Sequence, residues 1–415
     1  MMKKGKDMEK RSVRLRKRLA RKLTMMLAWG LAVALVACTP DEPVGPPEGP
    51  DTVVVRDTVI VPDTVIVPDT VLIPDTAVHY GMLHCVQPAF LKAGDKVALI
   101  SPSYFTPMST LQNAANVVRS WGLTPVLGPN CDKQWEGKYA GTPEERASDV
   151  RWAVNNPEIK AIICNRGGYG SIQLINLLST DEITASPKWI VGYSDISTLH
   201  GLWNSAGVMS LHGTMSTMFA SGGTSKTITL MHDFLLGKVP QYELPAHPQN
   251  IIGHAEGILV GGNICTFAPN LGTQADATRF DSLILFVEEV GESMHNVDRQ
   301  MRILQLNGVL DRCNGVILGQ FTNCGSEFAY SSCEAMLREM LEPYHIPVLC
   351  GFPAGHGNIN VPLVMGAHVT IDVRSVGSSV RFDIDGEKQT VRTADINAAA
   401  AFTPEELMRM AGKIE

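Results

Sequence analysis

Short apolar runs alternate with helix-like stretches between about residue 90 and residue 211, and this alternation constrains the fold more than any other feature of the chain. Strands are predicted at Val97–Ile100, Ala161–Cys164, Trp189–Val191 and Val208–Leu211. The helix-like stretches are 109–121, 143–155, 171–178 and 196–203. Such alternation predicts a doubly wound, mainly parallel α/β sheet with helices on both faces, where ligands bind at the carboxyl ends of the strands.

The pattern changes after a break at residues 240–248. Strands are predicted beyond it at 283–287, 315–318, 347–349, 369–373 and 380–384, whereas helices fit only at 297–306 and 332–341. More strands and fewer crossovers predict a separate, smaller, β-rich α+β domain. An active site is then expected at the cleft between the two domains.

The N-terminus has the pattern of an export signal. Residues 3–22 hold eleven Lys or Arg and precede the apolar stretch 23–37. That stretch is shorter than the about 20 residues that a spanning helix needs. It ends in Leu35-Val36-Ala37-Cys38, which resembles a bacterial lipobox and thereby implies a lipid on Cys38. The alternative is a signal anchor. Because Thr39 is not the Asp associated with inner-membrane retention, we expect an outer-membrane lipoprotein that faces the periplasm.

Residues 38–86 are predicted to be an extended linker. A six-residue unit, Asp-Thr-Val-Ile-Val-Pro or a close variant, occurs three times between Asp57 and Pro74. Proline at every sixth position blocks a helix, and Val and Ile favour extended backbone. The predicted order is a signal peptide (1–37), the linker (38–86), an α/β domain (87–240), a β-rich domain (250–395) and a C-terminal tail or helix (396–415).

The net charge limits the expected binding partners, and the cysteine content limits the expected disulfides and redox motifs. Without residues 1–37 the chain keeps 24 Lys and Arg against 40 Asp and Glu, a net charge of −16. A surface this acidic disfavours nucleic acid or anionic lipid as a partner. Apart from Cys38 there are eight cysteines and no Cys-x-x-Cys pair. Cys324 and Cys333 flank a polar loop and are candidates for a disulfide.

A serine follows the strand predicted at Trp189–Val191. The segment Gly192-Tyr193-Ser194-Asp195 joins this strand to a helix-like stretch. At such a sharp turn the hydroxyl is pushed clear of the sheet, and the N–H of Asp195 points toward whatever the hydroxyl attacks. Ser194 is therefore a candidate nucleophile that still needs a base. Ile196 stands where the α/β-hydrolase elbow requires glycine, which argues against that fold.

The base and its orienting acid are predicted in the second half. His356 lies in Gly355-His356-Gly357-Asn358, where the glycines allow close approach and leave the imidazole no apolar face. The alternative role for His356 is a hydrogen bond that caps its own loop. Glu288 and Glu289 end a strongly apolar run, where a buried carboxylate needs a partner. That partner is an imidazole or, in the structural alternative, an arginine of the following helix.

A glycine-rich loop, Arg166-Gly167-Gly168-Tyr169-Gly170, follows the strand predicted at Ala161–Cys164. A strand, a glycine turn and a helix can cradle a phosphate. The loop lacks both the G-x-G-x-x-G spacing and the Gly-Lys-Ser/Thr of a P-loop, however. The N–H of Gly167 or Gly168, beside that of Asp195, fits an oxyanion hole better.

Several short segments follow one another in a specific order between about residue 88 and residue 385. They are Leu91-Lys-Ala-Gly-Asp95, Val97-Ala-Leu-Ile-Ser-Pro-Ser103, Ala140-Gly-Thr142 with Glu145-Arg146, 166–170, 192–195, His212-Gly213, Gly261-Gly-Asn263, 285–289, Asp298-Arg299 and 351–358. This order resembles the LD-carboxypeptidase family of serine peptidases, which includes the microcin C immunity-type enzymes. Each segment alone is weak, but their order and spacing together are specific.

The resemblance implies an enzyme that cuts an L-to-D peptide bond and releases the terminal D-alanine of a murein tetrapeptide, without a metal or other cofactor. It implies Ser194 as nucleophile, His356 as base and Glu288 as orienting acid. It also implies the N–H groups of Asp195 and Gly168 as the oxyanion hole. The expected partners are a murein-derived peptide, the membrane through the lipid anchor and, in a homodimer, a second copy of the chain.

Two departures from the family pattern bear on specificity. Thr214 follows His212-Gly213, where the family usually has proline. Met294-His295-Asn296-Val297 precedes Asp298-Arg299, where the family usually has a Tyr-Arg-Ile segment. The alternatives to a murein carboxypeptidase are a carboxypeptidase of microcin C-like peptidyl-nucleotides and a non-catalytic lipoprotein that binds murein peptides.

Overall fold

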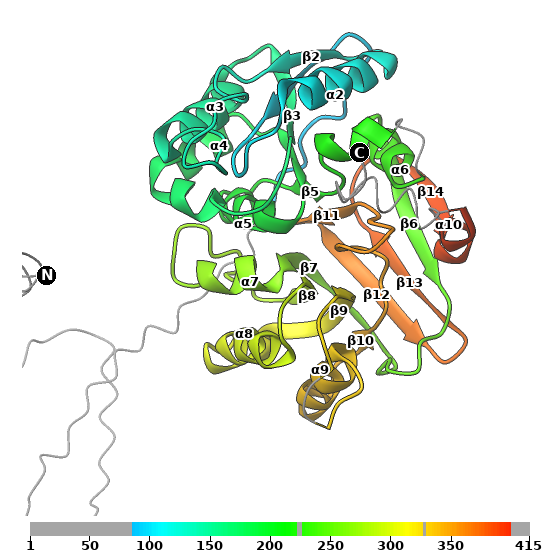
Figure 1. The fold of residues 1–415 in the computed structure, drawn as a ribbon. Coiled ribbons are helices and arrows are strands. Elements are labelled where there is room, and N and C mark those ends of the chain that lie inside the picture. The colour runs from blue at the N-terminus through cyan, green and yellow to red at the C-terminus, as the bar shows by residue number, and fades with distance from the viewer. Residues whose placement is uncertain (1–84, 222–225, 327–328, 400–415) are drawn as a thin grey trace, which may run out of the picture. The chain divides into compact units, whose positions relative to one another are not determined.

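The structure is a computed structural model that describes residues 85–221, 226–326 and 329–399. The predicted signal peptide, the lipidation residue Cys38, all but the last two residues of the linker, and most of the C-terminal tail lie outside these ranges. Within them the strands form two sheets, of six and of eight strands (Figure 1). No helix in the described ranges is long and apolar enough to cross a membrane.

The first sheet contains the strands predicted in the N-terminal half, and five of its strands run parallel. Its order is β11-β5-β4-β3-β1-β2. The bounds are β1 Lys96–Ile100, β2 Thr124–Leu127, β3 Ile159–Cys164, β4 Trp189–Gly192, β5 Ser210–His212 and β11 Leu363–Met365. Strand β11 comes from the second half of the chain and pairs antiparallel with β5. The sequence did not predict β2, which is only half-buried.

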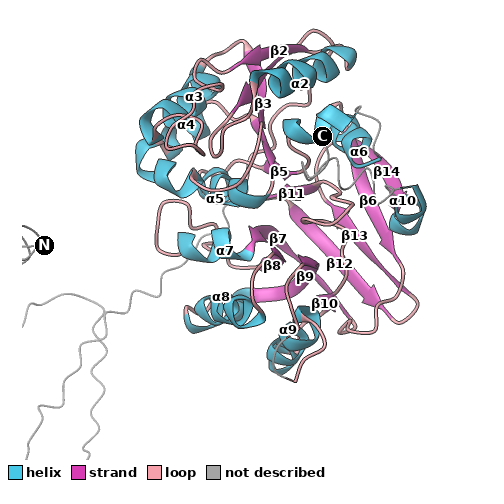
Figure 2. Ribbon diagram, in the orientation of Figure 1, coloured by secondary structure: helices cyan, strands magenta, loops and turns pink. Residues whose placement is uncertain are grey.

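Helices cover both faces of this sheet, as its alternating burial requires. Val97 and Leu99 of β1 enter one apolar cluster, and Ala98 and Ile100 enter the other. The helices are α2 Met108–Ser120, α3 Pro143–Asn155, α4 Thr180–Ala185 and α5 Ser197–Ser205. In Figure 2, α3, α4 and α5 lie together on one side of the strands. The predicted helix 171–178 is a 3-10 helix, η1 Ser171–Leu177.

The second sheet has the order β10-β9-β8-β7-β12-β13-β6-β14. Its bounds are β6 Lys238–Leu244, β7 Gly253–Asn263, β8 Leu283–Val290, β9 Cys313–Thr322, β10 Val348–Leu349, β12 His368–Arg374, β13 Gly377–Phe382 and β14 Glu387–Arg392. The four strands from β7 to β10 are parallel, and β7, β12, β13 and β6 pair antiparallel. The other helices are α6 Lys226–Leu235, α7 Ile264–Phe267, α8 Met294–Leu306, α9 Cys333–Leu341 and α10 Thr393–Ala399.

The two sheets exchange strands and share one apolar core. Strand β6 already belongs to the second sheet, although the sequence assigned residues up to 240 to the first domain. Strand β11 returns to the first sheet, and one cluster of buried side chains includes both Leu211 of β5 and Phe286 of β8. The predicted α/β class, with a mainly parallel sheet followed by a β-rich part, is confirmed.

Candidate active site

Ser194 lies on a turn that is strained and tightly packed. The turn follows β4, whose four residues are all buried. Ser194 has a φ of 64°, in the left-handed region that non-glycine residues seldom adopt, and such a conformation costs on the order of 1–3 kcal/mol. Gly192 is needed because a Cβ there would lie 2.8 Å from the Ile196 side chain. Strain of this kind persists only where the surroundings hold it, and it is concentrated at functional sites.

The glycine-rich loop after β3 lies directly against this turn. A Cβ on Gly167 would lie 3.0 Å from Cβ of Ser194, so a larger residue would press on the serine. Gly168 has a φ of 110°, and the ring of Tyr104 covers it. Within the described ranges, the N–H groups of Gly168 and Asp195 have no protein acceptor. Each of these N–H groups is therefore available to an acceptor on a bound ligand.

Glu288 and His356 are hydrogen-bonded. An imidazole was one of the two partners that the sequence predicts for this buried carboxylate, and an arginine was the other. Their Oε2 and Nδ1 atoms are 2.7 Å apart. Because a carboxylate only accepts, Nδ1 donates, which leaves Nε2 able to accept a proton. Glu288 is fully buried, and this burial raises its pKa while the bond from His356 opposes the rise. The histidine side chain is 15% exposed and remains accessible.

His356 reaches the neighbourhood of Ser194 across the boundary between the sheets. Its ring centroid lies 5.0 Å from that of Tyr193, the residue before Ser194. The hydroxyl of Thr266, which follows β7, lies 3.3 Å from the carbonyl oxygen of Ser194 and 3.0 Å from that of Asn263, and its one proton is shared between these two acceptors. Among the described residues, Ser194 Oγ and His356 share no hydrogen bond. Such bonds are often long before substrate binds and tighten in the complex.

The second glutamate of the pair has a different role. Glu289 accepts from Asn263 Nδ2 at 2.8 Å and from the N–H of Cys265 at 3.0 Å, so it holds the turn after β7. Neither glutamate pairs with an arginine of the following helix α8. Arg302 pairs with Asp298, and Arg299 donates to Asn296.

None of the motifs in the sequence includes Asn360, yet this residue holds the loop of His356. Its Oδ1 accepts from the N–H of Gly355 and from His212 Nε2, both at 3.0 Å. Burial lowers the pKa of His212 to about 3, so the ring is neutral and donates from Nε2. Asn360 thus links the loop of the second half to β5 of the first sheet. Its position in the segment Gly355-His-Gly-Asn-Ile-Asn360, four residues after His356, is the signal that could have found it.

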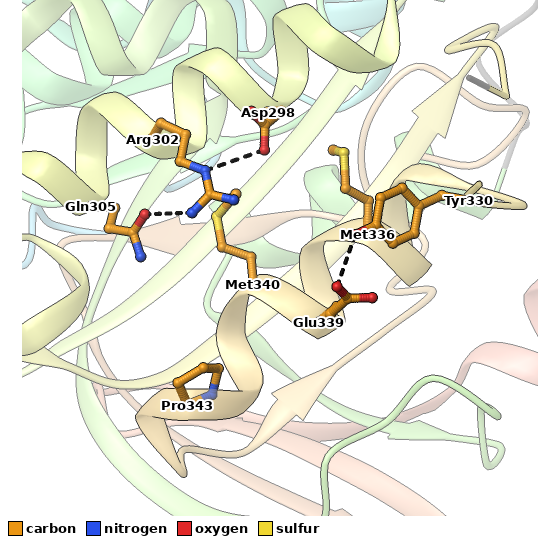
Figure 3. Close-up of a pocket in the computed structure, with 8 residues that line it drawn as sticks. All are labelled: Asp298, Arg302, Gln305, Tyr330, Met336, Glu339, Met340 and Pro343. Carbon is orange, nitrogen blue, oxygen red and sulfur yellow. Dashed lines mark hydrogen bonds and ion pairs between the residues drawn. The ribbon is translucent and has the colours of Figure 1, made fainter. Parts of the chain in front are cut away.

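Two other features lie outside this site. A hollow of about 370 Å³ lies between α8 and α9, and its three charged groups already have partners, because Arg302 pairs with Asp298 and Glu339 accepts from Tyr330 (Figure 3). Cys324 and Cys333 are free thiols, as are the other cysteines of the described ranges. Within those ranges, no three His, Cys, Asp or Glu side chains are grouped so as to hold a metal ion.

Comparison with known proteins agrees with this arrangement. Residues 97–213 match the LD-carboxypeptidase N-terminal domain, and residues 256–371 match the LD-carboxypeptidase C-terminal domain. A Synechocystis protein that carries a carboxypeptidase name is 32% identical over 292 residues, 69% of this chain and 94% of the relative. The microcin C7 self-immunity protein of Escherichia coli is 25% identical over 332 residues, 72% of this chain and 96% of the relative.

A solved structure shows the same relationship at the level of the fold. The muramoyltetrapeptide carboxypeptidase from Oxalobacter formigenes superposes with a TM-score of 0.63 at 28% sequence identity. The match covers 70% of this chain and 99% of that one. The Ser194 turn, the glycine-rich loop and the Glu288–His356 pair all fall inside the two matched domains. The chain therefore belongs to the LD-carboxypeptidase family of peptidases.

Proposed function

We propose that this protein is a serine-type L,D-carboxypeptidase that releases the terminal D-alanine from murein tetrapeptides through an acyl-enzyme. The observation that carries the proposal is the Glu288–His356 pair, which comes from the second half of the chain and lies beside the Ser194 turn. Membership of the family and the name of the Oxalobacter structure support the substrate class.

The proposed chemistry follows from the positions of the groups. Ser194 Oγ attacks the carbonyl carbon of the L-to-D peptide bond, and its proton passes to His356 Nε2. The N–H groups of Asp195 and Gly168 bind the oxyanion that forms, while Glu288 orients the imidazole and stabilises its charge. The proton then passes to the amine of the departing D-alanine as the C–N bond breaks. Water hydrolyses the resulting ester by the same proton transfers in reverse.

The test is mass spectrometry of tetrapeptide digests with the wild type and with Ser194→Ala. The wild-type enzyme is expected to remove one D-alanine from each peptide. The kcat of the variant is expected to be at least about 10⁴-fold lower, as in other serine enzymes that lack their nucleophile. Circular dichroism confirms that the variant is folded. Full turnover by Ser194→Ala would exclude this serine as the nucleophile.

A second candidate substrate is a microcin C-like peptidyl-nucleotide, because one relative carries a microcin immunity name. Such a site needs an aromatic side chain to stack on the base. Comparing kcat/KM for a murein tetrapeptide and for an acyl-adenylate mimic separates the two substrates. Binding of tetrapeptide without turnover, and without reaction with any serine-directed acylating probe, would instead favour a peptide-binding lipoprotein.

We also propose that the protein is exported and held at the outer membrane through a lipid on Cys38. The sequence Leu35-Val36-Ala37-Cys38 supports this location. Fractionation of cells that express the wild type or Cys38→Ala tests it. The wild type is expected in the outer-membrane fraction and the variant outside it, and equal distribution of the two would contradict the anchor.

A further inference from the structure

A buried carboxylate lies immediately beside the proposed nucleophile. Asp195 is only 2% exposed. Its Oδ2 accepts a hydrogen bond from Ser103 Oγ at 2.6 Å and another from the N–H of Ser171 at 2.8 Å. In the chemistry above only the backbone of Asp195 takes part, so these side-chain bonds are not explained by it. A carboxylate removed from water needs such donors, and each of them fixes where it can lie.

The two donors come from different segments that border the site. Ser103 follows β1, and Ser171 begins η1 at the end of the glycine-rich loop. Their hydroxyl oxygens are 3.0 Å apart. Since the single hydroxyl proton of Ser103 goes to Asp195, Ser171 donates to Ser103. The carboxylate therefore ties together the Ser194 turn, the end of β1 and the loop that carries Gly168.

A buried arginine holds the same two segments from behind. Arg146 is 1% exposed, and its Nη1 donates to the carbonyl oxygens of Pro102 at 2.7 Å and Gly170 at 3.0 Å. These two residues directly precede Ser103 and Ser171. Burial lowers the pKa of Arg146, and the charge of Asp195 opposes that fall. The Arg146 cation therefore interacts favourably with the charge of Asp195 and also binds the backbone next to both hydrogen-bond donors of that carboxylate.

We propose that the Asp195 side chain is a positioning group, braced by Arg146, that holds the strained Ser194 turn and the glycine-rich loop at a fixed separation. The two N–H groups of the oxyanion hole come one from each of these segments, at Asp195 and at Gly168. The side chain of Asp195 therefore sets the distance between its own backbone N–H and the N–H of Gly168. This inference rests on the proposed serine chemistry, but it is independent of which peptide is the substrate.

The test compares two buried aspartates. Asp195→Ala removes the positioning carboxylate, whereas Asp149→Ala removes a carboxylate that is equally buried, accepts from Asn130 and lies on α3. The readouts are the rate constant for labelling of Ser194 by a fluorophosphonate, kcat and KM for D-alanine release, and the melting temperature. Asp195→Ala is expected to slow labelling and kcat by about 10- to 100-fold with KM within about twofold. Asp149→Ala is expected to lower only the melting temperature.

Other outcomes are equally decisive. Ser103→Ala leaves Asp195 in place and removes one of its two hydrogen-bond donors, so the labelling rate and kcat should fall by a smaller factor. If Asp195→Ala does not fold, Ser103→Ala tests the inference in its place. Wild-type labelling rates in Ser103→Ala and Asp195→Ala would overturn the inference, as would an equal loss in Asp149→Ala. A wild type that is labelled at Ser194 but releases no D-alanine would overturn the proposed substrate and leave this inference standing.

Discussion

The turn that carries Ser194 and the loop that carries His356 are held in different ways. Around Ser194 a strained backbone is fixed chiefly by the buried carboxylate of Asp195, whose two hydrogen-bond donors both belong to the first half of the chain. The loop of His356 has hydrogen bonds to Glu288 on β8 and Gln320 on β9, and Asn360 within the loop bonds to His212 on β5. Ser194, the proposed nucleophile, thus lies on a strained turn braced by one buried carboxylate, whereas His356, the proposed base, lies on a loop held by hydrogen bonds from several strands. Changes on the two sides should therefore differ in kind.

Among the groups that hold Ser194 and His356 in place, the largest effect is expected from Glu288, the proposed orienting acid. Glu288→Gln keeps the shape but removes the charge that fixes the imidazole tautomer, and it should lower kcat by about 10³- to 10⁴-fold. Glu289→Gln is the matched control, because the neighbouring glutamate binds the turn at 263–265 instead of His356. It should reduce the melting temperature more than kcat. Equal losses of kcat in the two variants would show that the assignment of Glu288 is wrong.

Acid should destabilise the first half through its buried histidines. Burial lowers the pKa of His200 from 6.5 to about 4 and that of His212 to about 3. The unfolded chain binds these protons first, so the stabilisation is fully present above pH 6.5 and is lost as pH falls toward the folded values. At about 1.4 kcal/mol per pKa unit, the free energy of unfolding should fall by on the order of several kcal/mol by about pH 4.

The urea midpoint between pH 8 and pH 4 measures this loss. Asp149 acts in the opposite sense, because burial raises its pKa from 3.8 to about 6 and its contribution to stability is lost as pH rises. The measurement is therefore best made in Asp149→Asn, where that opposing titration is absent. A midpoint that stays constant from pH 7 to pH 4.5 in this variant would contradict the neutral, buried state of the two histidines.

Much of the site could be predicted because parallel strands place their carboxyl ends along one edge. Ser194 and Gly168 follow parallel strands of the first sheet, Glu288 lies in the C-terminal part of the parallel strand β8, and short-range patterns reveal strand ends. Strand β7 escaped prediction because Gly257, Gly261 and Gly262 weaken its strand signal. A Cβ at Gly261 would lie within 2 Å of the Phe286 carbonyl oxygen, so these glycines serve contacts that the local sequence cannot reveal. The hydrogen bond from His212 to Asn360 could not be predicted either, because the two residues are 148 positions apart in the sequence.

On the nucleophile's side, a small added group should act through strain. Gly167→Ala places a Cβ 3.0 Å from Cβ of Ser194 and 3.2 Å from its Oγ. Displacement of the serine by a fraction of an ångström should lower kcat by about 10- to 100-fold, with less effect on KM. Gly213→Ala is the control, since its nearest neighbours are 3.6 Å away or more. If both variants keep wild-type kcat, the loop is less tightly packed against Ser194 than the structure indicates.

On the side of the base, loss of one long-range contact should have a smaller effect because other contacts remain. Asn360→Ala removes the acceptor shared by Gly355 and His212, so we expect about a 10-fold lower kcat, while the bond from Gly357 to Gln320 still holds the loop. Asn360→Asp keeps the acceptor and should recover most of the activity. Asn358→Ala, on the exposed tip of the same loop, is the control. Should Asn360→Ala instead match the loss from Glu288→Gln, the loop would have no independent support, and the contrast between the two sides would fail.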